Sequence, residues 1–218
     1  YAPQGRAAPI VFDKATGKRR GSIPNAGGTY CLLTDDDQLI SGPKNQKEKN
    51  QVLQVADGTQ RNHLLTFQGT NRMLVNKGFA YLHQGESLTA LDRVPYATLQ
   101  GEKRQLLGKQ AAIAKQLKKR KNDQTLKSQH AELGKKVQQI TASLPKFFKW
   151  KTHCEHPIGF AMGGNTLYVG GNGIVKAYNA SNGEKQWSGK IEGKGYGLAI
   201  SNGRLLVSTD KGHIHCFE

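Results

Sequence analysis

Residues 173–187 read GIVKAYNASNGEKQW, and this stretch decides the fold: an apolar run ends in Ala-Tyr-Asn, a small polar turn follows, and a charged step leads to tryptophan. Less complete copies of this pattern begin earlier in the chain, as IVFDKATGKRR at Ile10 and as VLQVADGTQR at Val52. A stretch that recurs in this way is typical of a supersecondary unit that buries its apolar face only against its neighbours. The pattern therefore predicts a repeat protein.

Near the copies lies a short segment of aliphatic and aromatic residues, which favour a strand. Gly together with Asn or Asp flanks the segment and favours turns. Such a segment occurs four times, with equivalent apolar positions at Leu39, Phe79, Leu167 and Leu205. The steps between them are 40, 88 and 38 residues. A period near 40 with short strands is typical of a β-propeller blade of about four antiparallel strands. The long step predicts one period plus an insertion of about 50 residues.

Turn chemistry explains why the copies resemble one another. At 180–183, 15–17 and 56–58 we expect Gly to adopt a positive φ and Asn or Asp to hydrogen-bond to its own backbone. The glycine-rich segment 193–197, GKGYG, is predicted to link two units, because no helix pattern follows it as a phosphate-binding loop would require.

The predicted units differ in completeness. Residues 9–24 supply the last two strands of one unit, 29–68, 70–156 and 158–192 supply three whole units, and 195–218 supplies the first three strands of another. Because the two partial ends could complete one unit, we count about four blades. The chain begins with Tyr1 and ends in an apolar strand, so we expect a segment of a longer, seven- or eight-bladed ring.

The repeat is similar to that of the PQQ-binding-like β-propellers, the family of quinoprotein alcohol dehydrogenases and of an outer-membrane assembly lipoprotein. In that family a strand ending Ala-Leu-Asp is followed by a small-residue turn, Gly-Lys and Trp. The best matching copy consists of Ala177, Tyr178, Asn179, Gly183, Glu184, Lys185 and Trp187. The copy at 10–20 keeps Asp13, Gly17 and Lys18 but has arginine in place of Trp. The resemblance covers about three quarters of the chain and implies an all-β propeller and a periplasmic or other extracytoplasmic location.

The family's enzymes hold the quinone PQQ between a tryptophan and a disulfide of adjacent cysteines, next to a calcium ion. The three cysteines here, Cys31, Cys154 and Cys216, are far apart in sequence. Trp150 and Trp187 fall where such repeats use tryptophan to lock one blade against the next, and we assign them that role. We therefore expect no bound cofactor and no catalytic residue in this segment, PQQ being suggested only by the resemblance.

The insertion has a different composition, rich in Lys, Gln, Leu and Ala, which favour helix. Its apolar residues recur with heptad spacing in two runs: Leu99, Leu106, Ile113 and Leu117, then Leu126, Leu133, Val137, Ile140 and Leu144. Each run predicts a helix with one apolar seam, and Asn122 and Asp123 between them are good turn and N-cap residues. We predict an antiparallel helical hairpin at 98–145, inserted between propeller segments 1–97 and 146–218.

Positive charge is concentrated around the insertion. Residues 98–151 contain 14 Lys or Arg and 3 Asp or Glu, a net charge of +11 out of +16 for the chain. The simplest interpretation is a solvated helical face; the alternatives are contact with an acidic protein or anionic lipid, nucleic-acid binding, and pairing with another copy. The candidate interaction residues are Lys115, Lys118, Lys119, Arg120, Lys121 and Lys127.

Two short groups contain residue types that bind zinc or copper. They are His153, Cys154 and His156 in THCEHP, and His213, His215 and Cys216 in GHIHC. On a strand His213 and His215 share a face and Cys216 points away. Neither group has the CxxC pairing of a zinc site, so we expect hydrogen-bonded histidines and core cysteines and no metal. The acidic run 35–37 is expected to be a turn.

Two functions of different class remain. The first is a non-catalytic propeller scaffold that presents its faces and its basic hairpin to protein partners or to other blades of the same polypeptide. The alternative is a PQQ-dependent or other redox enzyme module whose cofactor residues lie outside this segment. No apolar run approaches 18 residues, so the sequence predicts no transmembrane segment.

Overall fold

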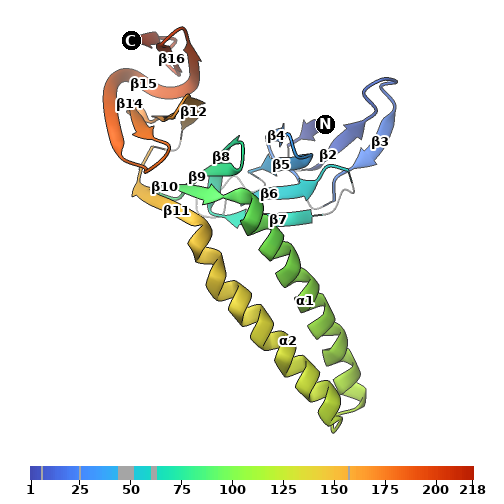
Figure 1. Cartoon of the computed structure of the whole chain (residues 1–218). Helices are drawn as coiled ribbons and strands as arrows, with labels where there is room; N and C mark the ends of the chain where they lie inside the picture. Colours follow the sequence, from blue (N-terminus) through green and yellow to red (C-terminus); the bar gives the residue numbers. More distant parts are fainter. Residues whose placement is uncertain (6, 25, 44–51, 60–62, 157) are drawn as a thin grey trace. The chain divides into compact units, whose positions relative to one another are not determined.

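The computed structural model describes residues 1–5, 7–24, 26–43, 52–59, 63–156 and 158–218 (Figure 1). The chain divides into two compact units: Tyr1–Leu91 with Lys149–Glu218 form the first, and Asp92–Phe148 form the second. The first unit consists of antiparallel sheets and the second of two helices and a short 3-10 turn. The predicted insertion, 98–145, lies within the second unit.

The first sheet contains β1 (Ala2–Gln4), β2 (Ala7–Phe12) and β3 (Arg19–Ser22) in the order β1-β2-β3. Two strands were predicted here, and β1 was missed because its three residues show no apolar alternation. The β2–β3 turn is confirmed. The Asp13 carboxylate accepts hydrogen bonds from the backbone N–H groups of Ala15 and Thr16 at 3.1 and 2.8 Å, and Gly17 has a φ of 68°.

The second sheet is a meander of β4 (Tyr30–Leu33), β5 (Gln38–Gly42), β6 (Val52–Asp57) and β7 (His63–Gln68). The acidic run 35–37 forms the β4–β5 turn, as predicted, with Asp37 at a φ of 56°. After β6 the expectation for Gly58 is wrong, because Gly58 does not have a positive φ. The strand runs through Asp57, whose carboxylate accepts from the Thr59 N–H at 2.8 Å. Residues 60 and 61, which end this repeat copy, lie outside the described residues.

The third sheet contains β8 (Thr70–Asn76), β9 (Phe79–Gln84), β10 (Ser87–Asp92) and β11 (Phe148–His153), in the order β11-β10-β9-β8. Strands β10 and β11 are neighbours in this sheet although more than 50 residues separate them in sequence. All of the helical unit lies between them in the chain. The sheet is therefore completed only after the chain has passed through both helices.

The fourth sheet has six strands in sequence order: β12 (Gly159–Gly163), β13 (Thr166–Gly170), β14 (Asn172–Asn179), β15 (Lys185–Ser201), β16 (Arg204–Thr209) and β17 (Ile214–Phe217). The β14–β15 turn repeats that of β2–β3: Asn179 Oδ1 accepts from the Ser181 N–H at 2.8 Å and Gly183 has a φ of 77°. This second predicted turn is confirmed.

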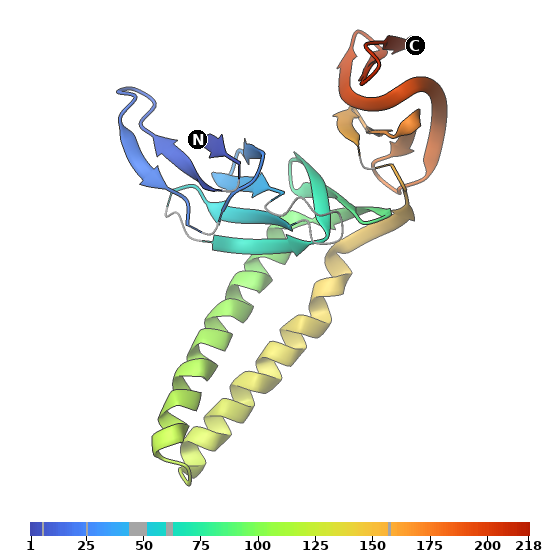
Figure 2. The same ribbon diagram turned by 180° about the vertical axis from the view of Figure 1, so that it is seen from behind.

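Strand β15 corrects the prediction of a linker at 193–197. Its first part pairs with β14 as far as Lys194, and its second part pairs with β16 from Gly195 onward. The two expected units are thus joined into one sheet by a single strand, which curls strongly (Figures 1 and 2). Gly193 has a φ of 89°, and the register shifts between Gly195 and Gly197, so the glycines let the strand bend without ending.

Apolar clusters fill the spaces between sheets. One cluster joins Leu88 and Tyr81 of the third sheet to Leu167 and Val169 of the fourth. A second joins Ile23, next to β3, to Leu39 on β5, and a third lies between the two halves of the curled sheet around Val175 and Val207. The first and second sheets, and the third and fourth sheets, therefore bury apolar faces against each other.

The second unit is a hairpin of α1 (Arg93–Lys119) and α2 (Gln124–Ser143), followed by the 3-10 turn η2 (Leu144–Phe147). The helices run side by side in opposite directions (Figures 1 and 2). Asp123 caps α2, since its carboxylate accepts from the Leu126 N–H at 3.1 Å. Neither helix of the described chain carries an apolar stretch of membrane-spanning length.

Leu167→Ala tests the contact between the third and fourth sheets. Leu167 is fully buried in that cluster, so its truncation leaves a cavity and is expected to lower the free energy of unfolding by about 2–5 kcal/mol. Ile214→Ala is the control, because the Ile214 side chain is 74% exposed and its loss costs little. Urea denaturation measures both, and equal losses would contradict the assigned packing.

Candidate functional site

Six exposed cations gather where the two helices meet: Lys115, Lys118, Lys119, Arg120, Lys121 and Lys127. Lys118 and Lys119 lie in the last turn of α1, where the helix dipole favours positive charge. None of the six has an ion-pair partner in the described part of the chain. The one nearby carboxylate, Asp123, is used to cap α2. This end of the hairpin therefore presents uncompensated positive charge to solvent.

The apolar seam between the helices is only partly covered. Leu106, Ile113 and Leu117 of α1 are half-buried, and in α2 only Ile140 is classed as buried. Polar residues also occupy seam positions. Gln110 Nε2 donates a hydrogen bond to the backbone oxygen of His130 at 3.3 Å, so part of the helix contact is polar.

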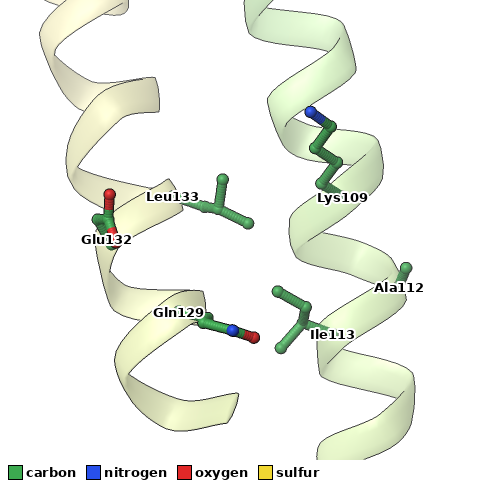
Figure 3. A pocket seen from close by; sticks show the side chains of 6 residues that line it. All are labelled: Lys109, Ala112, Ile113, Gln129, Glu132 and Leu133. Atoms are coloured by element: carbon green, nitrogen blue, oxygen red, sulfur yellow. The ribbon is translucent and has the colours of Figure 1, made fainter. Parts of the chain in front are cut away.

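A groove of about 400 Å³ opens between the helices (Figure 3). Its six lining residues come equally from the two helices: Lys109, Ala112, Ile113, Gln129, Glu132 and Leu133. Figure 3 shows Ile113 and Leu133 pointing into the space between the helices. The heptad pattern predicted that these two residues lie in the apolar seam. The spacing of residues along a sequence does not show which side of the seam remains exposed to solvent.

The carboxylate at the groove is neutralised by its own helix. Glu132 forms an ion pair with Lys136, one turn further along α2, at 2.7 Å. The hydrogen bond from Lys136 lowers the pKa of Glu132, which therefore stays ionised and paired. Lys109 supplies the remaining charge at the groove.

The first group of candidate metal ligands is dispersed in the structure. His153 Nε2 lies 2.8 Å from Glu155 Oε1 at the surface. Cys154 is buried in the cluster between the third and fourth sheets, beside Tyr178, whose pKa is raised by burial and by a hydrogen bond with the Cys154 thiol. The pKa of His156 is lowered by its burial. The three side chains thus have separate structural contacts.

The second group lies on and next to β17. His213 Nδ1 is 3.2 Å from Glu192 Oε2, and His215 Nε2 accepts from the Glu192 N–H at 3.0 Å. The His213 and His215 ring centroids are 6.0 Å apart. Cys216 is exposed, so the prediction that it is a core cysteine is wrong; β17 leaves this side chain uncovered. Among the residues that the structure describes, no three His, Cys, Asp or Glu side chains are arranged to hold a metal ion.

The two tryptophans occupy different environments. Trp150 on β11 donates from Nε1 to the Ala180 carbonyl at 2.9 Å, and its ring covers Gly183, where a Cβ would lie 2.5 Å from the ring. It thereby joins the third sheet to the β14–β15 turn of the fourth. Trp187 on β15 packs edge-on against Phe217, with ring centroids 4.9 Å apart, and lines a groove of about 200 Å³.

His83 is a buried polar residue that sequence analysis missed. It is 1% exposed on β9, its Nε2 lies 3.0 Å from the Cys154 carbonyl, and its Nδ1 has no hydrogen-bond partner in the part of the chain that the structure describes. Burial lowers its pKa, which keeps the ring neutral, so that Nε2–H donates to the carbonyl. In the sequence, the burial of His83 could have been inferred from its place in the strand FAYLHQ. The four central residues of this strand are all buried in the structure.

No protein-family model and no curated protein sequence matches the chain. Solved structures do match it. The computationally designed Ika4 protein is 8% identical, with a TM-score of 0.54, over 88% of this chain and 93% of Ika4. BamB from Moraxella catarrhalis is 13% identical, with a TM-score of 0.51, over 94% of this chain and 51% of BamB.

The similarity to BamB, a β-propeller, shows that the fold is propeller-like. At these identities the comparison concerns the fold alone. The chain spans about half the length of the BamB chain. The predicted class, antiparallel β-sheets of propeller type with two helices, is thus confirmed at this level.

Trp150→Phe tests the contact between the third sheet and the turn. The change removes the indole N–H and leaves the Ala180 carbonyl unpaired, so we expect a loss of about 1–3 kcal/mol of stability. Trp187→Phe is the matched control, since its indole N–H has no hydrogen-bond partner in the described chain. Chemical denaturation compares the two, and an equal or larger loss for Trp187→Phe would contradict this role of the Trp150 bond.

Acid is expected to destabilise the first unit through His83. Its folded pKa lies below the unfolded value of about 6.5, so the unfolded chain binds a proton that the native ring excludes. Stability is retained above that pH and falls below it, by at most about 1.4 kcal/mol per pH unit. His83→Gln should flatten the fall in denaturation midpoint between about pH 7 and pH 5. Leu167→Ala, the control, should lower stability without changing this slope; an unchanged slope in His83→Gln would refute the assignment.

Proposed function

We propose that the chain is a non-catalytic β-propeller scaffold that presents its sheet faces and its basic helical hairpin to protein partners. In this proposal the antiparallel sheets act as blades stacked around an axis, with Trp150 and Trp187 locking neighbouring blades. The resemblance of the fold to BamB supports the architecture. The partner role is supported by the hairpin.

One observation carries the proposal: the hairpin exposes, on one compact unit, both an apolar groove and six cations that have no ion-pair partner among the described residues. A helical face that only kept the protein soluble would need charge but no open apolar seam. Exposed apolar surface beside charged residues is typical of protein-interaction sites.

Site-specific photo-cross-linking tests the proposal. A benzophenone amino acid replaces Lys118 in the hairpin or, as the control, the exposed Lys14 in the β2–β3 turn, in the cells that make the protein. We expect a protein adduct at position 118 and none at 14, and its loss when Lys119 and Lys121 are changed to Glu. Adducts formed equally at both positions, or with lipid or nucleic acid alone, would contradict a protein-binding hairpin.

The redox alternative has its own measurement. The full-length gene product that contains this chain is purified, mixed with PQQ and calcium, dialysed, and examined by absorbance and by dye-linked alcohol oxidation. The scaffold proposal expects neither a retained chromophore nor dye reduction. A retained quinone with turnover would replace the scaffold by an enzyme module.

A further inference from the structure

We propose that the groove between α1 and α2 binds an acidic amphipathic helix from a protein partner. The inference deepens the scaffold function proposed above and rests on it. It assigns the class of partner and the surface that holds it. Three features support the inference: the apolar lining of the groove, the charges around it and the composition of the hairpin.

The apolar step comes from the incomplete seam. Half-buried residues recur at alternate spacings of four and three along both helices, as in a helical bundle, but each helix has only one helical neighbour. Ile113 and Leu133 therefore remain accessible in the groove. A third helix placed over them would cover both with residues at i, i+3, i+4 and i+7. The groove thus fits a helix with one apolar stripe.

A polar contact occupies the neighbouring seam position inside the hairpin. Gln110 uses its seam position for the hydrogen bond to the His130 carbonyl. At Gly134, one residue past Leu133, a Cβ would lie 3.1 Å from Gln110 Nε2, so glycine makes room for the amide. A leucine at position 110 would bury apolar surface between the two helices. Because glutamine stands there, that apolar surface remains available to an outside partner.

The charge step specifies the flanks of the partner helix. Glu132 is paired with Lys136, whereas Lys109 and the cations 115–127 have no carboxylate partner in the described structure. Acidic side chains beside the apolar stripe would meet these cations. Such complementarity speeds association and selects the partner by its charge.

Composition distinguishes the acidic helix from other occupants. The unit Asp92–Phe148 contains 13 Lys or Arg and 4 Asp or Glu, so a second copy would bring two strongly basic surfaces together. Residues 97–146 contain no Phe, Tyr or Trp on which nucleic-acid bases would stack. Neither phosphate alone nor a second copy uses both the apolar groove and the cations.

The binding experiment uses the whole 218-residue chain and fluorescein-labelled synthetic helices of about three heptads. The first peptide has Leu at the a and d positions and Glu on both flanks. The second replaces each Glu by Lys, and the third keeps Glu but replaces each Leu by Ser. Fluorescence anisotropy is expected to detect binding of the first peptide only, weakening as NaCl rises from about 50 to about 500 mM.

Variants of the chain locate the site. Ile113→Gln removes apolar lining, and Lys118→Glu with Lys119→Glu and Lys121→Glu reverses the charge. Each is expected to weaken binding about tenfold or more. The matched control, Lys14→Glu with Lys18→Glu and Lys211→Glu, makes the same charge change on the exposed surface of the first unit and should leave binding unchanged.

Circular dichroism verifies that each variant keeps its helices. Should Ile113→Gln lose them, Ala112→Glu replaces it, because Ala112 is exposed and a carboxylate there repels the peptide without disturbing the seam. Equal binding of the Lys peptide, or binding unaffected by both groove variants, would overturn the inference. So would sedimentation showing a dimer that Ile113→Gln dissociates, or displacement of the peptide by a DNA oligonucleotide or by phosphatidylserine vesicles.

The failures of the two proposals are distinguishable. A protein adduct at position 118 in cells, without any binding of the Leu/Glu peptide, would overturn the acidic-helix inference and keep the scaffold. The absence of any such adduct would remove the scaffold function itself, whatever the peptide does in solution.

Discussion

The apolar contact between consecutive sheets is the constraint on which the first unit depends. A single twisted sheet of three or four strands cannot bury its faces alone, so each must cover the next. Leu167 and Val169 do this for the third sheet by packing against Leu88 and Tyr81. Trp150 adds a directed hydrogen bond to the same contact, and His83 lies buried there because β9 is covered on both sides.

The same requirement explains why the hairpin differs from the sheets. Two helices supply each other with one neighbour, and a polar pair at Gln110 and His130 occupies part of their contact. Apolar side chains such as Ile113 therefore stay accessible, next to cations that have no ion-pair partner among the described residues. The hairpin therefore combines accessible apolar surface with exposed positive charge.

Sequence patterns predicted the turns at Asp13 and Asn179 and the two helices with their cap at Asp123, because each rests on local geometry. The predictions were wrong where the backbone conformation depends on contacts with residues distant in the sequence. Gly58 lies in the predicted turn but lacks the expected positive φ, and the predicted linker at 193–197 is part of β15, because strand pairing on both sides keeps that strand continuous. At the candidate site the cations and the seam were predicted from the sequence, whereas the open groove was not.

Local features of the structure thus follow from the amino-acid sequence: strand alternation, Asx–Gly turns, helix heptads and the position of the charge. These depend on side chains a few residues apart. The tertiary structure alone decided that β10 and β11 become neighbours across the whole hairpin, that Cys154 and His83 meet in one core, and that Ile113 faces an open groove. Such features depend on which surfaces cover one another, and no spacing along the chain specifies that.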